Sequence, residues 1–225
     1  TTAITDLAIG ENIFRWTVSN GPCANSLTED IVSIFVFDEN NPDAGAGSDQ
    51  QVCTPLTQAT LAGTGYTFPA TGTWTLVSGQ GTITDPADPA TTVTALGIGT
   101  NVFQWEVYNG GCINQLTNDV VEVVLFDASA PPADAGADQE FCAPDESANL
   151  TGNAPVGAAI GTWTRVQGTG NITSPNSPAT TVSGLSVGEN IFTWTLQGGI
   201  CVTTVDSVSL FVFDPSNPNA NAGLD

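Results

Sequence analysis

The chain repeats one sequence pattern three times. The segments TTAITDLAIGENIFRWTVSNGPC, TTVTALGIGTNVFQWEVYNGGC and TTVSGLSVGENIFTWTLQGGIC each precede a run rich in valine and phenylalanine that stops at an aspartate. Thr2, Thr92 and Thr181 hold the same place in these segments, so the period is 90 and then 89 residues (92 − 2 and 181 − 92). Such a period corresponds to one small domain per repeat and exceeds that of most solenoids. The pattern predicts a tandem array of similar domains.

The repeats start out of phase with the chain. We expect residues 1–43 to be the C-terminal half of a repeat, 44–133 and 134–222 to be complete repeats, and 223–225 to begin another. We therefore interpret the 225 residues as a window from a longer polypeptide.

Composition excludes several classes of function. The chain has 23 acidic residues against two arginines, with no lysine or histidine and a formal charge of −21, so it repels nucleic acid and anionic lipid. Solubility, cation binding and a saline habitat each account for this charge. Without lysine or histidine there is no Ser-His-Asp set, Schiff base or P-loop, and we expect no enzyme. No apolar run approaches the roughly 20 residues of a membrane span, so we expect no membrane insertion.

Alternating apolar residues predict strands throughout, because nothing of helical length has a 3.6-residue period. In the run from 102 to 108, Phe103, Trp105 and Val107 share the face that we expect to be buried. A following run places Val121 and Val123 inward, and a connection with asparagine and glycine joins the two runs as an antiparallel hairpin. About seven short strands in each repeat predict an all-β fold of tandem immunoglobulin-like β-sandwich domains.

The cysteines recur with the period of the repeats. Cys53 and Cys112 are 59 residues apart (112 − 53), as are Cys142 and Cys201 (201 − 142). We predict the disulfides Cys53–Cys112 and Cys142–Cys201, with Cys23 pairing outside the window, in an oxidising extracytoplasmic setting. Reduced core cysteines and a metal site are the alternatives.

One tryptophan in each complete repeat allows two interpretations. Trp74 and Trp163 stand in GTWT segments, where they are either core residues or platforms on which a sugar stacks.

The repeat resembles a known group of domains. The segments GTWT, SGQGTITDPADPATTVTALGIGTNVFQWEVYNGGC, DVVEVVLFD and PDAGAGSDQ or PADAGADQ together resemble the PKD-like and immunoglobulin-like tandem repeats of large Bacteroidota cell-surface proteins. These include type IX-secreted, SprB-like gliding adhesins. The resemblance covers the whole chain. It implies a bacterial cell-surface or secreted location and a role as stalk, filament or adhesin, and it supplies no catalytic residues.

Acidic residues recur where one repeat joins the next. Carboxylates between tandem sandwiches are the hard oxygen ligands that calcium takes, so we consider a calcium site at each joint. The alternative is that they serve turns and solubility, and Asn221 breaks the pattern in the last linker. The candidate ligands are Asp38, Asp43, Asp49, Asp127, Asp134 and Asp138.

Phenylalanines stand on the face of each last strand opposite the inward valines. We predict that they pack against a neighbouring domain or chain, the alternative being that a loop of their own domain covers them. These residues are Phe35, Phe37, Phe126, Phe211 and Phe213.

Two functions fit these features. In the first, the repeats are spacers in a long extracellular fibre or adhesin stalk that holds an adhesive end away from the cell in adhesion or gliding. In the second, each repeat binds glycan or protein and copy number supplies avidity. The expected partners are neighbouring repeats, identical chains in a filament and surface glycans. An exposed aromatic pair beside polar loops in each repeat favours the binding module, and burial of Trp74, Trp105 and their equivalents favours the spacer.

Overall fold

The computed structural model describes residues 2–23 and 27–216, and every regular element in these ranges is a strand. The expected start of a further repeat at residues 223–225, together with Asn221, lies outside the described residues. Within the described ranges no helix has the length and apolar character needed to cross a membrane. The fold class predicted from the alternating pattern, all-β with tandem immunoglobulin-like sandwiches, is confirmed.

The chain divides into two compact units. Unit 1 contains Thr1–Gln50 and Thr57–Val123, and unit 2 contains Gln51–Leu56 and Val124–Asp225. The division passes through the first and last strands of a repeat, because the ends of these strands pack with residues that follow Val124.

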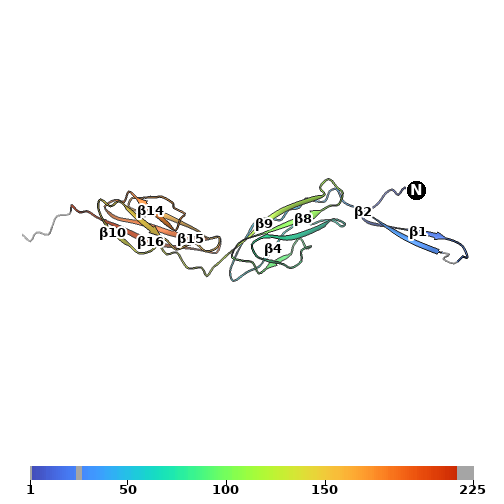
Figure 1. Cartoon of the computed structure of the whole chain (residues 1–225), viewed down its shortest axis with the longest axis horizontal. Helices are drawn as coiled ribbons and strands as arrows, with labels where there is room; N and C mark the ends of the chain where they lie inside the picture. The colour runs from blue at the N-terminus through green and yellow to red at the C-terminus, as the bar shows by residue number, and fades with distance from the viewer. Residues whose placement is uncertain (1, 24–26, 217–225) are drawn as a thin grey trace, which may run out of the picture. The chain divides into compact units, whose positions relative to one another are not determined.

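Unit 1 begins with a hairpin of the strands β1 (Gly10–Ser19) and β2 (Leu27–Val36). They pair antiparallel from Gly10 opposite Val36 to Ser19 opposite Leu27. The first complete repeat follows as two sheets, with strand orders β3-β9-β8-β5 and β4-β7-β6 (Figure 1). Its strands are β3 (Gln50–Cys53), β4 (Ala59–Thr60), β5 (Thr71–Ser78), β6 (Thr82–Ile83), β7 (Thr92–Thr94), β8 (Gly99–Tyr108) and β9 (Leu116–Phe126).

Unit 2 contains the same arrangement, with sheet orders β10-β16-β15-β12 and β11-β14-β13. β15 and β16 form the long antiparallel hairpin, which is drawn beside β10 and β14 in Figure 1. β10 adds to the edge of β16 in parallel, with Cys142 opposite Phe213. The strands are β10 (Gln139–Cys142), β11 (Ser147–Thr151), β12 (Ile160–Gln167), β13 (Asn171–Ile172), β14 (Ala179–Ser183), β15 (Gly188–Gly198) and β16 (Val202–Phe213).

A tryptophan pair forms the centre of each sandwich. The ring centroids of Trp74 and Trp105 lie 5.0 Å apart, as do those of Trp163 and Trp194. The Trp74 and Trp105 side chains are no more than 1% exposed, and each indole N–H donates to a backbone carbonyl oxygen. The core interpretation of Trp74 and Trp163 is therefore confirmed, since a buried ring offers no platform for a sugar.

A buried asparagine, not singled out from the sequence, fixes the start of each long hairpin. The amide of Asn101, 1% exposed, donates to the carbonyl oxygens of Gly97, Gly99 and Val123, while its oxygen accepts from the N–H of Gln80. Asn190 makes the corresponding four bonds in unit 2. These bonds satisfy backbone groups that burial would otherwise leave unpaired.

Candidate functional site at the repeat junctions

Within unit 1, the end of β2 packs against the hairpin tip of the repeat that follows. The Phe37 ring meets the Tyr108 ring edge-on, with centroids 6.4 Å apart, and a Cβ placed on Gly110 would collide with Phe37. Phe35 meets Phe68 in the same way at 6.2 Å. Glycine is needed at 110 for a second reason, because φ there is +58°.

Three asparagines connect the linker after β2 to the same hairpin tip. The buried Asn41 donates from its amide to the side-chain oxygen of Asn109, 3.2 Å away, and Asn109 donates to the backbone oxygen of Asp38 at 2.9 Å. Asn114 donates to the backbone oxygen of Asn41 at 2.8 Å and accepts from Asn109. Because Asn41 and Asn109 are shielded from water, breaking these bonds leaves unpaired buried groups.

Within unit 2, a disulfide holds the corresponding elements together. Cys53, at the end of β3, is bonded to Cys201, at the tip of the β15–β16 hairpin, with Cα atoms 5.7 Å apart. The bond encloses a sequence separation of 148 residues. On the chain-entropy model, closing a loop of this length stabilises the fold by about 5 kcal/mol. The bond joins the first strand of one repeat to the last hairpin of the next.

The predicted pairings Cys53–Cys112 and Cys142–Cys201 are therefore wrong. Cys142 lies opposite Phe213 at the end of β16, whereas Cys201 directly precedes the start of that strand. At ~3.3 Å per residue, eleven residues of strand put these ends ~36 Å apart, while a disulfide needs Cα atoms within about 7 Å. Cys53 has the same placement, since the N–H of Thr54 donates to the carbonyl oxygen of Phe126.

The remaining cysteines are thiols in this structure. Cys23 and Cys142 are exposed and Cys112 is half-buried. The prediction that Cys23 pairs outside the chain concerns residues that this chain does not contain, and it stays a prediction.

The disulfide in unit 2 is accompanied by the same phenylalanine-on-glycine contact that unit 1 shows. A Cβ on Gly199, where φ is +54°, would collide with the ring of Phe126, which is 7% exposed. The N–H of Ile200 donates to the side-chain oxygen of Gln51 at 3.0 Å. Phe126 and Gly199 correspond to Phe37 and Gly110, so the two junctions share one construction.

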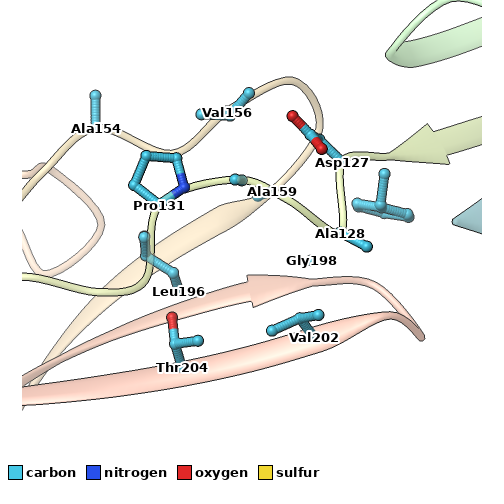
Figure 2. Close-up of a pocket in the computed structure, with 12 residues that line it drawn as sticks. Asp127, Ala128, Pro131, Ala154, Val156, Ala159, Leu196, Gly198, Val202 and Thr204 are labelled. Carbon is cyan, nitrogen blue, oxygen red and sulfur yellow. The ribbon is translucent and has the colours of Figure 1, made fainter. Parts of the chain in front are cut away.

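A small apolar pocket lies beside this junction in unit 2. Its volume is about 40 Å³, and Figure 2 shows its walls, which come from the linker after β9, the loop before β12 and the β15–β16 hairpin. Pro131, Val156, Leu196 and Val202 are among the apolar residues that line it. Ligand pockets occupy roughly 300–1,000 Å³, so this space is too small for a sugar or a nucleotide.

The six acidic candidates make hydrogen bonds within the chain. Asp49 accepts from the N–H of Glu122 at 2.9 Å, and Asp138 accepts from the N–H of Ser209 at 2.8 Å, which ties each first strand to the last strand of its own repeat. The other four accept from groups in the linkers or at the hairpin tip: Asp38 from Asn40, Asp43 from Asn114, Asp127 from Ser129 and Asp134 from Gly136.

These bonds agree with the turn interpretation of the acidic residues. In residues 2–23 and 27–216 no three acidic, histidine or cysteine side chains are grouped as a metal site would require. Calcium binding at the junctions stays a prediction.

Hydrogen bonds also shift the pKa of two linker carboxyls. The hydroxyl and the N–H of Ser129 hold the pKa of Asp127 below its ordinary value of 3.8, and the hydroxyl of Thr54 contributes in the same direction. Ser216 lowers the pKa of Asp214 in the same way. Each carboxylate closes the turn after its strand, and the bonds favour its charged form.

The five candidate interface phenylalanines fall into two groups. Phe35, Phe37 and Phe126 contact residues of the following repeat, as described above. Phe211 and Phe213 contact each other at the end of β16, with ring centroids 4.6 Å apart and exposures of 37% and 44%.

No protein-family model matches this chain. The chain is 27% identical over 227 residues to the mouse dyslexia-associated protein KIAA0319-like protein, across 95% of this chain and 22% of that protein. It therefore spans about a fifth of the length of this relative.

Two solved structures are similar to parts of this chain. The PKD domain from KIAA 1837 protein is 31% identical, with 41% of this chain and 96% of that domain covered and a TM-score of 0.35. The Sidekick-1 immunoglobulin domains 1–4 are 13% identical, with 76% of this chain and 49% of that one covered and a TM-score of 0.42.

Proposed function

We propose that this chain is a structural segment of a long extracellular surface fibre or adhesin stalk, whose repeats hold an adhesive end away from a bacterial cell. The observation that carries the proposal is the junction built twice from a phenylalanine on a hairpin-tip glycine, once with a disulfide across it. Such junctions limit bending between successive domains, because movement there must break buried contacts and stretch a covalent bond.

The burial of the tryptophans supports a spacer over a binding module. All four tryptophans of the complete repeats are buried, so none of them offers a platform for a sugar. A high negative charge also keeps crowded fibres soluble and apart. Attachment to a Bacteroidota surface, export by type IX secretion and a part in gliding belong to this proposal and rest on the resemblance of the repeat motifs.

Electron microscopy of the native full-length protein tests the proposal. Thin beaded fibres with one bead per repeat are expected, and reduction of the disulfides should make them more flexible. A parallel sample with a calcium chelator tests the junction carboxylates, since loss of straightness there would reveal a bound cation. Compact particles would contradict the stalk function and direct attention to glycan binding by isolated repeats.

A further inference from the structure

The unit 1 junction contains a dipeptide that is chemically unstable. Asn109 precedes Gly110 in the hairpin tip between β8 and β9. The side-chain amide of an asparagine is open to attack by the next backbone nitrogen, and a glycine in that place has no side chain to hinder the attack. Asparagine is accordingly one of the thermolabile residues of proteins. The surroundings of this one side chain therefore decide whether the reaction starts.

Hydrogen bonds hold the Asn109 side chain where the linker after β2 meets the hairpin tip, an arrangement that we call the closed junction. Its amide donates to the backbone oxygen of Asp38 at 2.9 Å and to the side-chain oxygen of Asn114 at 3.0 Å, and its oxygen accepts from Asn41 at 3.2 Å. The side chain is 0% exposed, which keeps water and base away from it. Because loss of the amide nitrogen breaks both donated bonds, the closed junction opposes the reaction.

We propose that Asn109 is a modification site, which deamidates when the unit 1 junction opens and whose product then keeps the junction open. The proposal needs the closed contacts of this junction and does not rest on the stalk function. It makes the junction a record of its own openings, since each opening gives the reaction a chance to proceed and the reaction does not reverse.

The chemistry needs only water. The backbone nitrogen of Gly110 attacks the side-chain carbonyl carbon of Asn109, gives its proton to solvent and expels ammonia, which leaves a cyclic succinimide. Water then opens the ring at one of its two carbonyl carbons, and position 109 becomes an aspartyl or an isoaspartyl residue. One water molecule replaces one ammonia molecule overall, so no oxidant or cofactor takes part.

The product does not fit the closed junction. A carboxylate has no hydrogen to donate, so the oxygens of Asp38 and Asn114 lose their donor. It also places a charge where the side chain is fully buried, which is costly without a cationic partner. An isoaspartyl linkage adds a backbone methylene, which displaces the N–H of Asn109 from the carbonyl oxygen of Gln115 that it contacts at 2.7 Å. Either product therefore favours the open junction.

The unit 2 junction has no such dipeptide. Gly198 holds the place of Asn109, because each stands three residues before the cysteine of its hairpin tip (201 − 198 and 112 − 109). A glycine has no side chain that could deamidate. This junction carries the disulfide between Cys53 and Cys201. The two described junctions thus differ in their chemistry, and the modification belongs to the one in unit 1.

Deamidation rates of the 225-residue chain test the protection. The chain is incubated at neutral pH with and without guanidinium chloride, and peptide mapping by mass spectrometry follows position 109 separately from the Asn20–Gly21 pair. Folding should slow the conversion of Asn109 about tenfold or more, since two donated bonds must break in the folded chain. Equal rates in the folded and the unfolded chain would overturn the proposal.

Variants that loosen the junction test whether its opening controls the reaction. Asn41→Ala removes one bond to Asn109, and Phe37→Ala removes the ring that covers Gly110. Each should speed the conversion in the folded chain about fivefold. Phe126→Ala makes the same change at the unit 2 junction and is the matched control, which should leave the rate unchanged. Unchanged rates in both unit 1 variants, or an equal increase in the control, would contradict the proposal.

Asn109→Asp supplies one product directly and tests whether it holds the junction open. The N–H of Thr67 reports on the closed junction, because it donates to the side-chain oxygen of Asn41 at 2.9 Å. Its hydrogen exchange should be about tenfold or more faster in the variant, and the N–H of Trp74, which lies in the core, should change less. Equal protection of Thr67 in the variant and in the unmodified chain would show that the product is accommodated, and would overturn the proposal.

Discussion

Stretching the chain from its two ends identifies the bonded cysteines, because a disulfide withholds the residues between them from extension. The Cys53–Cys201 bond encloses 148 residues and leaves 77 of the 225 free to extend (225 − 148). At about 3.6 Å per extended residue, the unfolded oxidised chain should reach about 280 Å.

Cys53→Ser removes the bond and returns the enclosed 148 residues to the stretch. The fully extended length should then increase by about 530 Å. Single-molecule force spectroscopy on chains anchored at both termini measures this increase. Cys112→Ser is the matched control and should leave the extended length unchanged, because Cys112 is a thiol.

A smaller increase would contradict the junction that the structure shows. If each cysteine paired within its own repeat, every bond would enclose only 59 residues (112 − 53 and 201 − 142). Cys53→Ser would then lengthen the chain by about 210 Å, and Cys112→Ser would have the same effect. That pair of results would restore the pairing suggested by the sequence spacing.

Three further predictions concern single side chains. Gly110→Ala should destabilise its junction by about 2–3 kcal/mol, because the added methyl meets the Phe37 ring and φ is positive. Gly21→Ala has the same positive φ with open space beside it, and should cost only about 1 kcal/mol. Hydrogen exchange measures both losses, and equal losses of protection at the two hairpin tips would contradict the ring contact. Asn101→Leu should lower the free energy of unfolding by about 2–4 kcal/mol, because it leaves buried backbone carbonyl oxygens without a donor. Denaturant unfolding followed by tryptophan fluorescence measures this loss, and a loss below about 0.5 kcal/mol would show that the amide is dispensable. The lowered pKa of Asp127 adds stability that is present above its unfolded pKa and is lost as the pH falls through the folded pKa. Because the Ser129 hydroxyl lowers this pKa, Ser129→Ala should raise it toward 3.8 in an NMR titration. An unchanged pKa would exclude the hydroxyl as the cause.

The sequence predicted the domain class and the core well, because both follow from local alternation. Phe103, Trp105 and Val107 alternate with polar residues in β8, and all three are buried as expected. Alternation of apolar residues does not indicate the buried Asn101 and Asn190, although they recur at the repeat period together with Asn12 (101 − 12 and 190 − 101 are both 89). A polar residue repeated at one position in every domain is a signal that alternation of apolar residues does not contain.

The sequence does not distinguish pairing within a repeat from pairing between repeats, because both schemes recur with the repeat period. Any bond between equivalent positions recurs with the repeat, whether it lies within one domain or joins two. The choice depends on the direction of β10, which runs parallel to β16 and carries Cys142 to the end of the domain opposite Cys201. Strand direction at a sheet edge comes from tertiary pairing and leaves no periodic mark in the sequence.

The most direct test of the junction is disulfide mapping of the oxidised chain under non-reducing conditions. A peptide containing Cys53 linked to Cys201 is predicted, with Cys112 recovered as a blocked thiol. Recovery of Cys53 linked to Cys112, together with Cys142 linked to Cys201, would contradict a covalent connection between successive repeats.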